Sequence, residues 1–142
     1  MSEAEQQCIF CAIVAGNVPC EKIFEDDHVF VFLDIHPINR GHALVIPKAH
    51  YENIFTTPVD IFQQIMKTAH HLSPHIKKVS LADGINIGMN NGLAAGQLVF
   101  HAHVHVIPRF VNDGHKHWSA ISYAEGEMAT LGEQIRTDLR CE

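Results

Sequence analysis

Residues 100–109 read Phe-His-Ala-His-Val-His-Val-Ile-Pro-Arg, a run in which His101, His103 and His105 follow one another at intervals of two residues. Side chains of a β-strand alternate between two faces, so this spacing predicts three imidazoles on one face and apolar side chains on the other. Residues two apart on a strand are separated by about 6.6 Å, which lets the rings serve one small substrate. Because imidazole titrates near neutral pH, the strand is predicted to carry chemistry.

The chain of 142 residues has the size of a single domain, and we expect one domain over residues 1–142. Its composition, 46% hydrophobic and 18% charged, is ordinary for a globular protein. No apolar run approaches the roughly 20 residues that a membrane-spanning helix requires, so no membrane association is expected. Residues 1–7 are acidic and polar, unlike a secretory signal, which favours a cytoplasmic location.

The balance of charge limits the partners that the chain attracts. With 16 acidic and 10 basic residues, its formal net charge is −6 when the histidines are neutral. An acidic chain without a run of Lys or Arg does not attract polymeric nucleic acid, so we expect none. A small anionic substrate is still compatible with this charge, because imidazoles and backbone N–H groups can make one pocket locally positive.

Short apolar runs bounded by turn residues predict four strands besides the histidine strand. They cover residues 22–26, 28–34, 42–47 and 85–90. Turn-forming residues 36–41 separate the second and third runs, and these strands are expected to pair as neighbours. A run of strands with one long helix inserted between the third and fourth predicts an α+β fold with an antiparallel sheet.

The long helix is predicted to start at residues 57–60 and to bury one apolar stripe, because its apolar residues recur every three or four positions. The stripe consists of Ile61, Phe62, Ile65, Met66, Ala69, Leu72 and Ile76. Pro74 lacks a backbone N–H and is expected to kink or end this helix near Ser73. A second, shorter helix is expected over residues 129–139.

Three chemical roles compete for the histidine strand: a metal cluster, a pair of proton-transfer groups, or a nucleophile with helpers. Histidines two residues apart chelate metals in several enzyme folds. No Asp or Glu occurs between Gly84 and Phe110, however, so further ligands would have to come from distant parts of the chain. The spacing alone leaves the three roles open.

Residues 96–108, Gly-Gln-Leu-Val-Phe-His-Ala-His-Val-His-Val-Ile-Pro, resemble the signature of the histidine triad (HIT) nucleotide-binding family. Further blocks match in order over about residues 8–110: Cys8-Ile-Phe-Cys11, Phe32-Leu33-Asp34, Gly41-His-Ala-Leu-Val-Ile-Pro-Lys48 and Asn90-Asn-Gly92. The tail, residues 111–142, matches no block. The resemblance implies a HIT-like fold, with a five-stranded antiparallel sheet, one long and one shorter helix, and two such sheets joined across a homodimer.

By the same resemblance, the chain is a nucleotide hydrolase or transferase that acts at the α-phosphorus of nucleoside phosphoramidates or dinucleoside polyphosphates. His103 stands at the position of the nucleophile and would form a covalent nucleotidyl-histidine. His105 would bind the α-phosphate or assist the leaving group, and Gln97 would lie near the phosphate. A purine nucleotide is the substrate that the family implies.

Further positions match residues that bind the nucleotide. Asp34 matches the ribose-binding position, where a carboxylate accepts hydrogen bonds from both hydroxyls. His42 matches a histidine that lines the same pocket, and Asn90 matches a polar group that reaches the phosphate. With Gln97 and His105, these residues form the predicted nucleotide-binding set. An apolar pocket for the base can be drawn from Ile9, Phe10, Phe24, Phe32 and Leu33.

Cys8 and Cys11 form a Cys-x-x-Cys motif ahead of the first predicted strand, whereas a thioredoxin-like redox pair should follow a strand. Half of a tetrahedral zinc site fits better, and two buried reduced thiols are the alternative. In a branch of the family with this motif, two histidines complete the site, and they correspond to His50 and His101. The resemblance therefore implies a closed, structural zinc held by these four residues.

Two other functions compete with covalent catalysis. A metal-dependent hydrolase would use the His-x-His-x-His strand as its ligands and would lose turnover on chelation. A nucleotide-binding or interaction module would keep the pocket but show negligible turnover.

Overall fold

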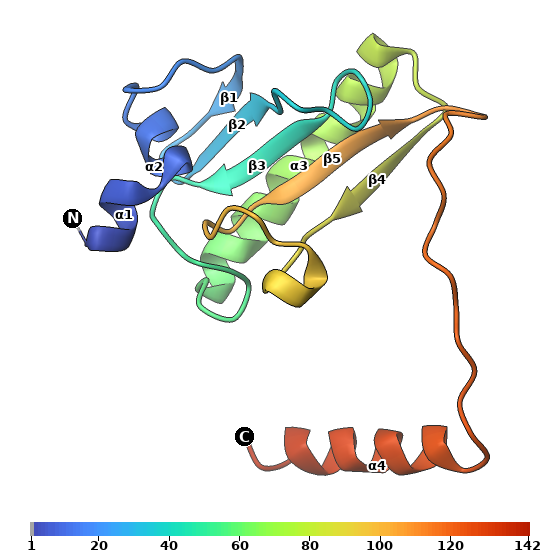
Figure 1. Ribbon diagram of the computed structural model, residues 1–142. Helices are drawn as coiled ribbons and strands as arrows, with labels where there is room; N and C mark the ends of the chain where they lie inside the picture. Colours follow the sequence, from blue (N-terminus) through green and yellow to red (C-terminus); the bar gives the residue numbers. More distant parts are fainter. Residues whose placement is uncertain (1) are drawn as a thin grey trace.

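The computed structural model describes residues 2–142 and contains one antiparallel sheet of five strands (Figure 1). The strands are β1 (Lys22–Glu25), β2 (Val29–Leu33), β3 (Ala43–Pro47), β4 (Gly84–Gly88) and β5 (Val104–Arg109). Their order across the sheet is β1-β2-β3-β5-β4, and each neighbouring pair is antiparallel. The predicted α+β fold with a five-stranded antiparallel sheet is therefore confirmed.

The α-helices of the described chain are α1 (Glu3–Gln7), α2 (Ile9–Val14), α3 (Val59–Ser80) and α4 (Glu127–Leu139), and a 3₁₀ turn, η1, covers Leu93–Ala95. The helix α3 crosses one face of the sheet, whereas α4 stands apart at the end of an extended segment and has no buried residue (Figure 1). The long and the shorter predicted helices are α3 and α4. The sequence pattern does not predict α1 and α2. Among residues 2–142, no helix is both long and apolar enough to cross a membrane.

The two faces of the sheet carry separate apolar clusters. On β2, Val29 and Val31 pack into the cluster beneath α3, whereas Phe30 and Phe32 pack with residues of α2 on the opposite face. Adjacent residues of a strand point to opposite faces, so an uninterrupted apolar run lets β2 pack on both sides. The α2 side of the sheet is the face on which the histidines lie.

The helix α3 does not end near Ser73, so a helix end at Pro74 is the part of the prediction that is wrong. Pro74 lies inside a helix that continues to Ser80 and ends where Leu81 adopts a left-handed conformation at φ 59°. On either side of the proline, Leu72 and Ile76 pack against the cluster beneath α3. Proline removes only one backbone hydrogen bond, and apolar contacts on both sides of it hold the helix together.

The histidine strand is shorter than its sequence pattern predicts. The strand β5 begins at Val104, which pairs with Val45 of β3, so His101 and His103 lie in the segment before the ladder. The N–H of Ala102 donates to the carbonyl of Tyr51 at 2.7 Å, and this contact with a loop replaces a contact with β3. The alternation of faces nevertheless continues, because Ala102 is fully buried and Val104 packs beneath α3.

Ile65 of α3 tests the cluster beneath this helix, because its side chain is fully buried there. We expect Ile65→Ala to lower the free energy of unfolding by about 2–5 kcal/mol, since it removes buried methyl groups and leaves a cavity. Val79 of the same helix is 84% exposed, so Val79→Ala should change stability by roughly 0.5 kcal/mol or less. Chemical denaturation measures both, and equal losses would contradict this location of the core.

Candidate functional site

The three imidazoles of the motif lie in sequence along the α2 side of the sheet, and two of them are buried. His101 is fully buried and His103 is 6% exposed. The rings of His103 and His105 are 5.0 Å apart between centroids. Phe10 of α2 packs edge-on against His103 at 5.2 Å and lies 5.9 Å from His101, so α2 fixes the position of both rings.

Cys8, Cys11, His50 and His101 form a group that could hold a metal ion, since their donor atoms lie within 4.8 Å of one another. The Nδ1 atom of His101 is 3.5 Å from the Sγ atom of each cysteine. The Nδ1 atom of His50 is 3.3 Å from Cys11 Sγ and 3.3 Å from His101 Nδ1. The four residues that the sequence predicts as ligands are therefore brought together.

Local structure places these ligands. Cys8 caps the N-terminus of α2 and Cys11 follows in its first turn, so both thiols lie at the same end of one short helix. The Nε2–H of His101 donates to the carbonyl of Pro47 at 2.8 Å, which leaves the lone pair of Nδ1 directed at the thiols. Burial lowers the pKa of His101 to about 4 and keeps its imidazole neutral, the form that binds metals.

The protonation of the Cys11 thiol is also changed by its surroundings. Burial, followed by the hydrogen bond and charge of Cys8, raises the pKa of the Cys11 thiol to about 12. Two thiolates this close repel each other in an apolar setting, and a bound cation would reverse this effect. None of the four cysteines forms a disulfide.

His103 has one tautomer that fits its surroundings. Its Nδ1 atom lies 2.6 Å from the carbonyl oxygen of His101, so Nδ1–H donates and Nε2 keeps its lone pair. Burial lowers the pKa of His103, which favours the neutral ring. The buried imidazole of His103 therefore offers a nucleophile or a base at Nε2.

His105 has the opposite tautomer, because of a chain of hydrogen bonds that starts at the backbone. The N–H of Ile38 donates to Nδ1 of His42 at 3.1 Å, so the proton of a neutral His42 is on Nε2. That Nε2–H then donates to Nδ1 of His105 at 2.9 Å, which places the proton of a neutral His105 on its own Nε2. His105 therefore presents a donor where His103 presents an acceptor.

Burial keeps the two hydrogen-bonded imidazoles of His42 and His105 neutral. It lowers the pKa of His42, and it lowers the pKa of His105 to about 4, an effect that the neighbouring imidazoles of His103 and His42 reinforce. Asp34 lies beside the pair: its Oδ2 atom is 3.8 Å from Nε2 of His42, and its Oδ1 atom accepts the N–H of His36 at 2.9 Å. Asp34, His42 and His105, three residues of the predicted nucleotide-binding set, thus lie close together.

Asp34, His42 and His105 have donor atoms close enough for a second cation site, but hydrogen bonds already occupy both nitrogens of His42. In the motif, His101 faces the cysteines, His103 bonds a backbone carbonyl and His105 bonds His42. The three histidines therefore have different partners, and this arrangement does not favour one metal ion held by all three.

Gln97 is buried at 1% exposure, and both ends of its carboxamide bond the backbone. Its oxygen accepts the N–H of Gly92 at 2.8 Å, while its nitrogen donates to the carbonyls of Glu52 and Val99 at 2.6 and 3.1 Å. Gly92 has a φ of +93°, a conformation that glycine adopts without a Cβ clash. Gln97 thus fixes the turn around η1.

Asn90 and His105 both line a cavity of about 360 Å³. The tail lines the same cavity from residues 115 to 118, which sequence reasoning assigned no role. The Asp-Gly pair at residues 113–114 was the available signal, because it marks a turn that brings the tail back to the sheet.

The five residues drawn together for a base pocket do not line one site. Phe10 and Phe32 are in edge contact at 5.4 Å on the α2 side, whereas Phe24 and Leu33 pack toward α3. Ile9 is 45% exposed. Neighbours such as Phe32 and Leu33 must point to opposite faces of β2, so the sequence block could not place them in one pocket.

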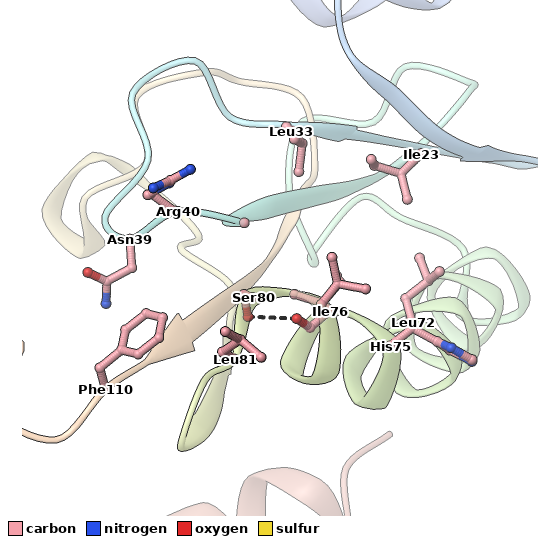
Figure 2. A pocket seen from close by; sticks show the side chains of 12 residues that line it. Ile23, Leu33, Asn39, Arg40, Leu72, His75, Ile76, Ser80, Leu81 and Phe110 are labelled. Carbon is pink, nitrogen blue, oxygen red and sulfur yellow. Dashed lines mark hydrogen bonds between the residues drawn. The ribbon is translucent and has the colours of Figure 1, made fainter.

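A larger cavity, of about 910 Å³, lies on the other side of the molecule between α3 and the ends of β1 and β2 (Figure 2). Apolar side chains such as Ile23, Leu33, Leu72, Ile76 and Phe110 line most of it, with Arg40 and His75 at its edge. Leu33 was predicted for the base pocket, but within residues 2–142 none of the residues predicted for catalysis, phosphate binding or metal binding lines this cavity, so its size does not mark the chemistry.

Comparisons with known proteins agree with this geometry. The model of the HIT domain matches residues 15–112. The adenylylsulfatase HINT3 of Arabidopsis thaliana is 40% identical over 112 residues, which cover 79% of this chain and 57% of that protein. The crystal structure of a HIT family member from Bacillus subtilis superposes with a TM-score of 0.85 at 36% identity, covering 92% of this chain and 96% of that one.

A structure with a metal also matches. A zinc-bound histidine triad family protein from Mycobacterium smegmatis superposes with a TM-score of 0.75 at 35% identity, over 94% of this chain and 99% of that one. The family model covers more than half of the chain, and the sheet, the histidine motif and the cysteine pair lie in the regions expected from the resemblance. The chain belongs to the HIT domain family.

Proposed function

We propose that this protein is a nucleotide hydrolase or transferase that acts at the α-phosphorus of nucleoside phosphoramidates or dinucleoside polyphosphates through a covalent nucleotidyl-histidine. The observation that carries this proposal is the pair of opposite tautomers at His103 and His105, whose rings are 5.0 Å apart. One ring offers a lone pair and the next offers an N–H donor. A nucleophile and a hydrogen-bond donor held side by side are suited to displacement at phosphorus.

In the first step, the Nε2 lone pair of His103 attacks the α-phosphorus, a P–N bond forms, and the bond from phosphorus to the leaving group breaks. The neutral ring of His105 keeps its proton: its Nε2–H donates a hydrogen bond to the departing atom and stabilises the charge that develops there, and an amine leaving group takes up a proton from water. In the second step, water attacks the phosphorus while the Nε2–H of His105 again donates to a phosphoryl oxygen, and the water's proton is lost to the solvent. The P–N bond then breaks and returns its electron pair to His103, which releases a nucleoside monophosphate.

The remaining residues bind or position the substrate in this proposal. Asp34 accepts the ribose hydroxyls, and His42 maintains the tautomer of His105. Asn90 reaches the phosphate from beside His105. Gln97 has its carboxamide bonded to the backbone, so we assign it a positioning role, in which it holds the N–H groups of the 92–96 loop.

The name of the Arabidopsis relative, adenylylsulfatase, supports a nucleotide whose α-phosphorus bears a departing group. We take a purine as the base by analogy with the family. We also propose that residues 1–142 form a single HIT domain and that two copies form a homodimer. The helix α4 supports the dimer, because its apolar residues Met128, Leu131, Ile135 and Leu139 are exposed. A short amphipathic helix needs a packing partner to be stable.

Zinc is the ion that we propose for the group formed by Cys8, Cys11, His50 and His101. Zn–S bonds of about 2.3 Å and Zn–N bonds of about 2.0 Å in a tetrahedron separate neighbouring ligand atoms by roughly 3.3–3.8 Å. The distances from His101 Nδ1 to both thiols, from His50 Nδ1 to Cys11 and between the two imidazoles are 3.3 or 3.5 Å and fit that range. Four protein ligands leave no open position, so the zinc would stabilise the fold and take no part in the reaction.

His103→Ala tests the nucleophile. We expect turnover of adenosine phosphoramidate to fall by at least about a thousandfold, because covalent catalysis is lost, while binding of AMP stays within a few-fold of the wild type. Mass spectrometry of wild type denatured at alkaline pH during turnover, where the P–N bond is stable, should detect the nucleotidyl adduct, which the variant should lack. His70→Ala, an exposed position on α3, is the matched control. Undiminished turnover in His103→Ala would refute the mechanism, and a protein without turnover would be a binding module.

The pH dependence of kcat/KM tests the protonation state of His103. Protonation of Nε2 removes the attacking lone pair, and burial holds the pKa of His103 below its ordinary value of 6.5. The rate should therefore stay level as the pH falls from 8 to 6.5. It should decrease at lower pH, approaching about tenfold per pH unit. An acid limb centred above pH 7 would contradict a buried, neutral nucleophile.

Metal content tests the zinc site. Protein purified without chelator should contain about one zinc per chain by elemental analysis, and Cys8→Ser should lose the metal and melt several degrees lower. Cys141→Ser, which changes an exposed cysteine of the tail, is the control. Chelation should reduce activity only as far as it unfolds the protein, whereas loss of turnover with an intact fold would favour metal-dependent catalysis.

A further inference from the structure

The cavity of about 360 Å³ that His105 lines is bordered by basic and neutral side chains. Within residues 2–142, its lining includes Arg109, His115, Lys116 and His117 but no Asp or Glu. The whole chain carries 16 acidic and 10 basic residues, so a wall that holds only basic and neutral groups departs from the average surface. Such a cavity favours an anionic ligand.

Asp113 anchors the part of the tail that closes this cavity. Its carboxylate accepts two bonds from the Arg109 guanidinium, at 2.7 and 3.0 Å, and one from the Asn39 amide at 3.0 Å. The N–H groups of Phe110 and His115 donate to the same carboxylate at 3.1 and 3.0 Å. These contacts start the tail in a defined direction along β5.

Residues 112–114 form a turn that reverses the direction of the chain after β5. Asn112 has φ 63° and Gly114 has φ 81°, two left-handed positions that bring the chain back over the sheet. The side chain of His115 then contacts the carbonyl of Ile38 at 3.1 Å. Ile38 is also the residue whose N–H sets the tautomer of His42, so the tail is attached to the same loop as the catalytic hydrogen-bond chain.

The positive charge that remains in the cavity belongs to Lys116. The charge of Arg109 is balanced by Asp113. In the described chain, Lys116 forms no ion pair, although it lines the cavity with His105. An unpaired ammonium next to a proton donor is suited to bind a departing oxyanion.

The geometry of displacement at phosphorus indicates which part of the substrate occupies the cavity. A nucleophile and a leaving group lie roughly in line on opposite sides of the phosphorus atom. His105 lines the cavity whereas His103 does not, so the cavity lies on the side of His105 away from the attacking ring. A group that leaves from a phosphorus held between these rings therefore departs toward Lys116.

We propose that this cavity is the leaving-group subsite and that Lys116 selects substrates whose leaving group is anionic, a phosphate chain or a sulfate. The inference rests on the proposed function and names the substrate class of the same site. It assigns a role to the tail, which lies largely beyond the residues that the HIT domain model matches.

The test compares three adenylyl substrates that differ in the leaving group. For Lys116→Ala, we expect kcat/KM to fall about tenfold with diadenosine tetraphosphate or adenylyl sulfate, because a charge-assisted contact is lost. With adenosine phosphoramidate, whose leaving group is uncharged ammonia, the change should stay within twofold. A loss with only one anionic substrate identifies which anion the subsite takes. Lys78→Ala, an exposed lysine of α3, should affect none of them.

Equal losses on all three substrates, or no loss on any, would overturn the subsite. A separate binding measurement distinguishes this failure from failure of the proposed function. Titration of inorganic tripolyphosphate into the AMP-bound protein should show about tenfold weaker binding for Lys116→Ala than for Lys78→Ala, even if no substrate turns over. Equal affinities would also refute the proposal.

Discussion

The hydrogen bond from His103 Nδ1 to the carbonyl oxygen of His101, at 2.6 Å, is the contact on which the site depends. It joins two centres through one residue, because the side chain of His101 faces the cysteines while its carbonyl fixes the ring of His103. A second link runs through Phe10, which lies between Cys8 and Cys11 and packs edge-on against His103. The group that could hold a metal and the position of the proposed nucleophile are therefore mechanically coupled.

Backbone partners give identical side chains different roles. The carbonyl oxygen of His101 accepts from Nδ1–H of His103, so Nε2 of His103 carries no proton. The N–H of Ile38 donates to His42, whose Nε2–H donates to Nδ1 of His105, so Nε2 of His105 carries the proton. Neither assignment needs a charged neighbour, and burial keeps both rings neutral. The strand provides the spacing, and the loop that carries Ile38 provides the asymmetry.

Sequence patterns predicted the features that depend on local periodicity or on recognised blocks. The alternation around His101, His103 and His105 gave the correct face, and the Cys-x-x-Cys motif with two distant histidines gave a group that closes in space. The start of β5 was missed because a loop carbonyl at Tyr51 competes with β3 for the N–H of Ala102, which no local pattern encodes. The residues proposed for a base pocket were divided between faces because their side of the sheet was left unassigned.

The end of α3 and the role of the tail depend on tertiary contacts in the same way. Pro74 ends a helix only if nothing holds the next turn, and here apolar contacts on both sides do so. The tail has no clean period, yet Asp113 gathers Arg109, Asn39 and two backbone N–H groups around one carboxylate. This contact uses the charge of Arg109 and leaves that of Lys116 free beside His105. An acidic protein can thus have one basic cavity that suits an anionic substrate, because none of its described Asp or Glu residues lines that cavity.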